Sequence, residues 1–239
     1  MKHLMRLFTA GCLALSASIG TALAADNVPY VVRGNTHMLI GVTLDETAVR
    51  EVLPEGLEPA EGVSGGFQVY TSGGGEGVAA YSRSYVWVNL AGYDSLTGNQ
   101  GRFILWLSDT EHAAKMAKIG YITTAGAVAL SEADGKLEGS VTVDGTPLAK
   151  GSVNAGECGA GTGVINYPSV PTWSDNKMAV TQYAFAGKFC GAELTGLEIS
   201  APADHMLSKL NPQPAGWAAV ARELSFSATP AMPLPVKAE

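Results

Sequence analysis

The stretch VAAYSRSYVWVNLAGY, residues 78–93, decides the fold class of this 239-residue chain. Along it Tyr81, Arg83 and Tyr85 fall on one side, and the residues between them fall on the other. Successive side chains of a β-strand point to opposite faces of the sheet, so a period of two predicts a strand with two different environments.

Further apolar and β-branched runs predict strands before and after this stretch, several of them paired as hairpins. Asp144-Gly145 separates two such runs and is a typical hairpin turn. The predicted strands are HMLIGVTL (37–44), GGFQVYT (65–71), GRFILWL (101–107), KLEGSVTV (136–143), TPLAKGSV (146–153), 177–199 and 220–230. GAGTG at 159–163 lacks the strand-to-helix context of a nucleotide loop, and we expect a turn there.

Three short helices complete the pattern. Asp45 is a good N-cap for a helix over 46–53, and SDTE at 108–111 has the form of a capping box for a second. The third is expected at 203–210, between two prolines. The fold class is therefore mainly β with a few short helices (α+β). Residues 25–239 contain no charge block or Pro/Ser-rich linker at which the chain could be divided, so we expect a single domain there.

Residues 1–24 have the form of a signal peptide. Lys2 and Arg6 precede a short apolar stretch, which ends in the small-x-small pattern Ala22-Leu23-Ala24. Nothing later approaches the ~20 continuous apolar residues that a membrane span needs. We expect an exported protein without a transmembrane segment, either periplasmic or extracellular.

Charge and cysteine content narrow the function classes. Removing Lys2 and Arg6 from the 15 basic residues leaves 13 against 22 acidic ones, a net charge of −9, which argues against a nucleic-acid partner. Only Cys158 and Cys190 remain after cleavage, and in an oxidising compartment we expect them to form a disulfide. The alternative, a redox or metal pair, lacks CxxC spacing.

The histidines and the paired lysines are interpreted as structural. His37, His112 and His205 show no HxxH or HExxH spacing, so we expect surface or capping residues and no metal site. Lys115 and Lys118 fall on the polar face of the second helix, where nothing removes water from a lysine to lower its pKa.

Three segments resemble the acetoacetate decarboxylase family. LDETAVREVLPEGLEPAEG (44–62) is similar to its opening helix and LPEGLE turn, and WLSDTEHAAKMA (106–117) to the segment before its catalytic lysine. LSFSATPAMPLPVK (224–237) is similar to its closing strand. The resemblance implies a closed, cone-like antiparallel β-barrel around a central cavity.

The family's Schiff-base chemistry needs two adjacent lysines, one to attack the keto substrate and one to depress its pKa. Residues 123–126 (TTAG) occupy the matching place, with no amine. Gln68 and Arg83 fall where the family has glutamates, and Arg33 or Asn35 where it has an arginine. The ligand-binding candidates are Arg33, Gln68, Tyr81 and Arg83, hydrogen-bond donors suited to a carboxylate or another oxygen-rich ligand.

Three functions remain open. The leading hypothesis is binding of a small acidic or keto compound in the central cavity without Schiff-base decarboxylation. The alternative is a lyase or hydrolase that uses the same cavity with different residues. A third is a structural or interaction protein with a filled cavity. We expect no cofactor, and a homo-oligomer is left open.

Overall fold

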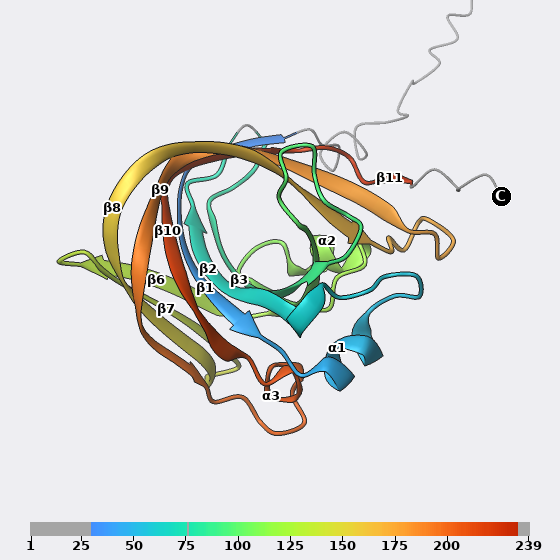
Figure 1. The fold of residues 1–239 in the computed structure, drawn as a ribbon, viewed down its shortest axis with the longest axis horizontal. Helices are drawn as coiled ribbons and strands as arrows, with labels where there is room; N and C mark the ends of the chain where they lie inside the picture. The colour runs from blue at the N-terminus through green and yellow to red at the C-terminus, as the bar shows by residue number, and fades with distance from the viewer. Residues whose placement is uncertain (1–29, 76, 234–239) are drawn as a thin grey trace, which may run out of the picture.

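The computed structural model describes residues 30–75 and 77–233 (Figure 1). The predicted signal peptide, residues 1–24, lies outside the described residues. The strands are β1 (Tyr30–Thr43), β2 (Ser64–Ser72), β3 (Tyr81–Leu90), β4 (Gly101–Asp109), β5 (Thr123–Ala125), β6 (Ala127–Ala133), β7 (Lys136–Val143), β8 (Thr146–Ser169), β9 (Ala179–Ile199), β10 (Gln213–Ala228) and β11 (Met232–Pro233). The helices are α1 (Glu46–Val52), α2 (Ala113–Lys118) and α3 (Met206–Leu210), with a 3-10 turn at Glu61–Val63.

One sheet contains all of these strands, which confirms the mainly β class. Its order is β5-β4-β3-β2-β1-β10-β9-β8-β7-β6, with β11 beside β9, and β4–β5 is a parallel pair. The sheet curls strongly but does not close, so the expectation of a closed barrel is wrong (Figure 1). β5 offers only three residues for pairing, and after Gly126 the chain turns away to pair along β7 instead.

The alternation in residues 78–93 separates two buried clusters. Tyr81, Tyr85 and Trp87 of β3 enter an aromatic cluster, whereas Val86 and Val88 enter a larger aliphatic one. β6, β7, α1 and α3 contribute to the aliphatic cluster and cover that face of the sheet. The opposite, aromatic face is left to border a cavity, so a single strand supplies both the packing that stabilises the fold and the wall of the cavity.

The two longest strands, β8 and β9, arch across the molecule from one cluster to the other (Figure 1). In β8, Leu148 belongs to the aliphatic cluster and Tyr167 to the aromatic one. The glycine-rich residues 159–163 lie between them and pair with β9, so the turn predicted there is wrong. Two of these glycines permit close packing instead: a Cβ on Gly161 would lie 2.6 Å from the ring of Phe189, and one on Gly163 would lie 2.6 Å from the ring of Phe185.

Bulges decide which side chains of β1 and β10 face the cavity. In β10 the register shifts around Glu223, which has a φ of 51°. Ala221 and Leu224 therefore both line the cavity, although three residues apart in a regular strand would face opposite sides. A similar shift between Asn35 and His37 of β1 precedes the part of that strand that reaches the cavity.

Two of the three predicted helices are present within their expected ranges, although α3 begins three residues later than expected. In α1 the side chain of Asp45 accepts a hydrogen bond from the Ala48 N–H at 2.9 Å, as its N-cap role predicts. α3 occupies the last part of residues 203–210. No helix in the described ranges is long and apolar enough to cross a membrane.

The capping box predicted at 108–111 is wrong. Ser108 and Asp109 still belong to β4, and α2 begins only at Ala113. Asp109 accepts hydrogen bonds from the N–H groups of Glu111 and His112 at 2.7 and 2.6 Å, so it stabilises the turn before the helix. The position predicted for the lysines of α2 is confirmed, since both are exposed.

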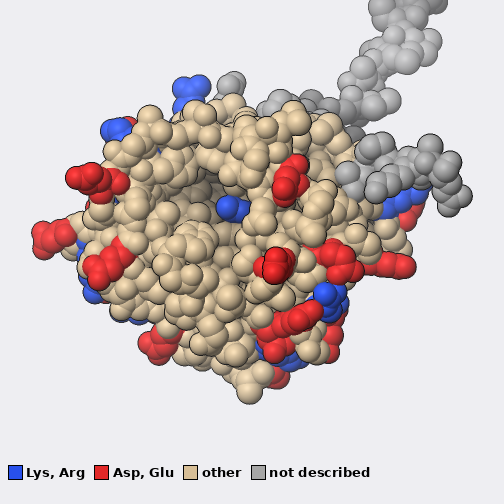
Figure 2. Space-filling view, viewed as in Figure 1, with Lys and Arg blue, Asp and Glu red and all other residues tan. Residues whose placement is uncertain are grey.

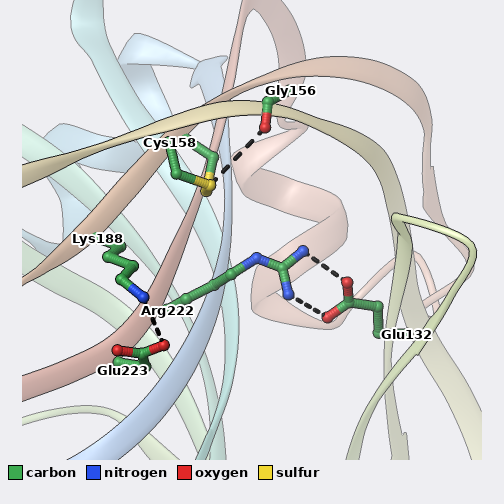
Figure 3. The surroundings of a disulfide bond; sticks show 7 residues. Glu132, Gly156, Cys158, Lys188, Arg222 and Glu223 are labelled. Carbon is green, nitrogen blue, oxygen red and sulfur yellow. Dashed lines mark hydrogen bonds and ion pairs between the residues drawn. A yellow bond between two sulfur atoms is a disulfide. The ribbon is translucent and has the colours of Figure 1, made fainter.

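The predicted disulfide joins Cys158 of β8 to Cys190 of β9, which are register partners. Figure 3 shows two ion pairs near it. One of them is bidentate: Arg222 of β10 reaches Glu132 of β6 at 2.5 and 2.6 Å, across 90 residues of sequence. The disulfide therefore joins two consecutive strands, and the ion pair connects strands that are distant in the chain.

Replacing Cys158 and Cys190 together by alanine should lower the free energy of unfolding by about 2–4 kcal/mol, because the bridge closes a loop of 32 residues in the unfolded chain. Urea unfolding of both proteins, with and without reductant, measures this. Reductant should destabilise the wild type and leave the double variant unchanged. Equal sensitivity of the two proteins would show that the disulfide does not provide the difference.

Candidate functional site

A cavity of about 420 Å³ lies between the aromatic face of β1–β4 and the strands β8–β10. Its volume is in the range of small-molecule sites. Aromatic rings dominate the wall: Tyr70, Tyr85, Tyr167, Tyr183, Phe185, Phe189, Trp217 and Phe226. Figure 2, viewed as in Figure 1, shows a hollow in this face of the molecule with basic side-chain atoms inside it.

Arg83 is the buried cation of the cavity. Its Nε donates to Oδ2 of Asp109 at 2.6 Å, and its guanidinium lies 4.9 Å from the ring centroid of Tyr81. Burial opposes ionisation of Asp109, but the charge of Arg83 and the N–H groups of His112 and Glu111 outweigh it and hold the pKa of Asp109 below its ordinary value. The two charges of this pair therefore compensate each other.

His37 and Gln68 form a second buried polar pair. Nε2 of Gln68 lies 2.5 Å from Nδ1 of His37, and the imidazole stacks on Tyr70 with 4.3 Å between ring centroids. Burial lowers the pKa of His37 to about 3, so the ring is neutral near pH 7. With the Gln68 amide donating to Nδ1, the ring proton lies on Nε2, which has no partner among the described residues.

The tyrosines of the cavity are neutral hydrogen-bonding groups. The Tyr70 hydroxyl donates to that of Tyr81 at 3.2 Å, and the hydroxyls of Tyr85 and Tyr167 lie 3.3 Å apart. Burial raises the pKa of Tyr70 and of Tyr85 well above the ordinary value. Phenolates are therefore not formed near neutral pH, and these rings offer hydroxyl groups rather than bases.

Arg102 of β4 is the second cation that lines the cavity. Its guanidinium lies 4.4 Å from the ring centroid of Trp87, and the residue is half-buried. Unlike Arg83, it makes no ion pair with any described residue. Since the described lining contains no Asp or Glu, the cavity has a net positive charge within an acidic protein.

Every lysine in residues 30–75 and 77–233 is exposed, and none lines the cavity. Two examples are Lys150, which lies 3.6 Å from Glu138, and Lys188, which pairs with Glu223 at 2.8 Å. The described residues also contain no group of three or more His, Cys, Asp or Glu side chains that could hold a metal ion.

The structure brings together three of the four predicted site residues, two of them in the cavity wall. Gln68 and Arg83 line the cavity. Tyr81 is buried beside it and contacts Arg83 and Tyr70. Arg33 is exposed and is not part of the cavity wall.

Besides the aromatic residues of the wall, two basic residues of the site, His37 and Arg102, were not recognised from the sequence. His37 was expected on the surface or at a cap, which is wrong for this histidine, although His112 and His205 do occupy the N-cap positions of α2 and α3. Strand alternation could have indicated the position of His37, because consecutive residues face opposite sides and Met38 faces the core. Alternation likewise puts Arg102 in line with Ile104, and both line the cavity.

The chain matches no protein-family model and no curated protein sequence. Solved structures do match. A structure of acetoacetate decarboxylase is 16% identical, with a TM-score of 0.68 over 90% of this chain and 93% of that one. Acetoacetate decarboxylase from Legionella pneumophila is 13% identical, with a TM-score of 0.68 over 88% of each chain.

A third match is the enduracididine biosynthesis enzyme MppR complexed with pyruvate. It is 14% identical, with a TM-score of 0.63 over 84% of this chain and 87% of that one. These structures agree with the described chain in its strand-rich architecture over most of their length. The chain therefore has the fold of acetoacetate decarboxylase and acetoacetate decarboxylase-like enzymes.

Proposed function

We propose that this protein binds a small acidic or keto compound in its central cavity and does not decarboxylate it through a Schiff base. The composition of the cavity wall carries the proposal. Two arginines and several neutral donors surround the space, while Asp, Glu and Lys are missing from its described lining. Such a wall favours a carboxylate or a carbonyl oxygen.

Schiff-base formation needs a lysine whose pKa is lowered by burial or by a neighbouring cation. The described lysines are exposed to water, and none of them lines the cavity in which a keto substrate would bind. Residues 123–126, which match the family's lysine pair, form β5 and the glycine after it, and they supply no amine. Arg83 and Gln68 stand in place of the two glutamates. Glutamates would interact favourably with a lysine, whereas these two side chains donate hydrogen bonds to an anion.

The comparisons support the ligand class. MppR, which has a similar fold, was solved with pyruvate, a keto acid. The same molecule would place a carboxylate and a keto oxygen among the donors of this cavity. Export of the protein is supported by the disulfide between Cys158 and Cys190, since such bonds persist mainly in oxidising compartments.

Incubation with acetoacetate and borohydride should leave no covalent adduct on this protein. Borohydride reduces a Schiff base to a stable amine, and intact-mass measurement followed by peptide mapping would find it on any lysine. Acetoacetate decarboxylase treated in parallel provides the positive control. A stoichiometric adduct on a single lysine would reject the proposal and favour the lyase alternative.

Pyruvate binding should be measurable by calorimetry and should depend on the cavity. Ala219 lines the cavity, so the Ala219→Phe variant should fill part of it and weaken binding by about tenfold or more. Ala129→Phe, on the exposed side of β6, is the matched control and should bind as the wild type does. If neither pyruvate nor acetoacetate binds the wild type, or if both variants bind equally, the proposed cavity function fails.

A further inference from the structure

One wall of the cavity is a set of aromatic rings already packed against one another. Tyr167 of β8 meets Tyr183 of β9 with 5.0 Å between ring centroids, and Tyr183 meets Phe226 of β10 at 5.8 Å. Phe185 lines the cavity from the same strand as Tyr183. We call these four residues the ring wall. Because its rings are held by neighbours, a flat ligand can pack on it with little loss of side-chain entropy.

Arg102 provides a single charged contact for such a ligand. The indole of Trp87 supports its guanidinium from one face, which leaves the edge N–H groups for a planar partner. A carboxylate matches that edge with two parallel hydrogen bonds. Within the described residues no Asp or Glu competes for this position.

The other charged group of the cavity is already compensated. Arg83 is paired with fully buried Asp109, so a second anionic group on the ligand would have to compete with that carboxylate. His37 is uncharged in its buried position and supplies only a hydrogen bond. These conditions favour one negative charge on the ligand, not two.

We propose that the ligand is a monocarboxylate with a flat aromatic body, its carboxylate at Arg102 and its body on the ring wall. This inference rests on the proposed function and names the ligand class for the same cavity. The size of the cavity, about 420 Å³, accommodates an aromatic ring with a short acidic side chain.

Calorimetric titration with three probes tests the two contacts separately. Phenylacetate carries both features, acetate has the charge without the ring, and phenylacetamide has the ring without the charge. Phenylacetate should bind about tenfold or more tightly than either of the others, because burying the ring and pairing the carboxylate each contribute at least that factor.

The variant Arg102→Gln should remove the preference for phenylacetate over phenylacetamide and retain the preference for phenylacetate over acetate. Arg102→Lys, which keeps the charge but not the paired N–H groups, should retain part of the first preference. Arg50→Gln, on exposed α1, is the matched control and should behave as the wild type. Thermal unfolding of each variant establishes that it is folded.

Equal affinity for phenylacetate and acetate would overturn the role of the ring wall. Undiminished binding of phenylacetate by Arg102→Gln would overturn the role of the arginine. Either result could occur with pyruvate still bound in the cavity, and the proposed function would then stand. If none of these carboxylates and neither keto acid binds the wild type, the proposed function itself fails.

Discussion

The variant Arg83→Met should lower the free energy of unfolding by about 3–5 kcal/mol. The arginine is buried, and its partner Asp109 is fully buried on the other side of a 2.6 Å contact. Methionine would fill much of the same volume but leave the Asp109 carboxylate without its cation in an environment that solvates a charge poorly. Urea unfolding at neutral pH measures the loss.

Two further variants separate the loss of the buried charge pair from general damage. Adding Asp109→Asn to Arg83→Met should restore part of the lost stability, because the amide oxygen can still accept from the N–H groups of Glu111 and His112 without a charge. Arg50→Met removes an exposed arginine with two ion pairs and should have a much smaller effect. If Arg83→Met is no worse than Arg50→Met, the buried pair does not stabilise the fold.

The sequence predicted those elements whose geometry is determined by residues close to one another in the chain. The two-sided pattern of residues 78–93 became β3, with its aromatic and aliphatic clusters on opposite faces. Asp144 and Gly145 have φ angles of 49° and 77°, as the tight hairpin turn requires. The disulfide was predicted from the expected export and from the number of cysteines, neither of which depends on three-dimensional details.

Long-range pairing decided what the sequence could not predict. Residues 159–163 have a turn-like composition, yet β9 runs beside them and needs small residues where Phe189 packs on Gly161. The sheet stays open between β5 and β6 because β5 pairs with β4 and β6 pairs with β7. Local composition contains no information about that partner strand.

The site was predicted in part for the same reason. Gln68 and Arg83 were predicted through the family resemblance, which matches them to positions of its glutamates. His37 and Arg102 have no such counterpart, and their place in the cavity depends on the curvature of the sheet and on the bulges of β1 and β4. A histidine between a threonine and a methionine is compatible with either face until that register is known.

Stability should fall with acidification because of His37, by about 1.4 kcal/mol per pH unit below its ordinary pKa. In the folded protein burial lowers that pKa from 6.5 to about 3. Between these values the unfolded chain binds the proton and the folded protein does not. The contribution of the neutral ring to stability is therefore complete above pH 6.5 and declines as the pH falls toward 3. Asp109, whose pKa is also lowered, acts in the same direction only below its ordinary value of 3.8.

Urea unfolding of the wild type and His37→Gln between pH 6.5 and about 5.5 tests this effect, because ordinary carboxylates titrate mainly below that range. Glutamine keeps a polar group beside Gln68 but binds no proton, so its stability should decline less steeply with acid, whatever its value at neutral pH. His205→Asn is the control: it retains an acceptor for the N-cap of α3 and removes a histidine outside the cavity. Desolvation also lowers the pKa of His205, which is only partly buried, so the control should lose a smaller part of the steep decline than His37→Gln does. Parallel curves for His37→Gln and the wild type would mean that His37 can be protonated within the fold, and the cavity would then contain a third cationic side chain, beside Arg83 and Arg102, in acid.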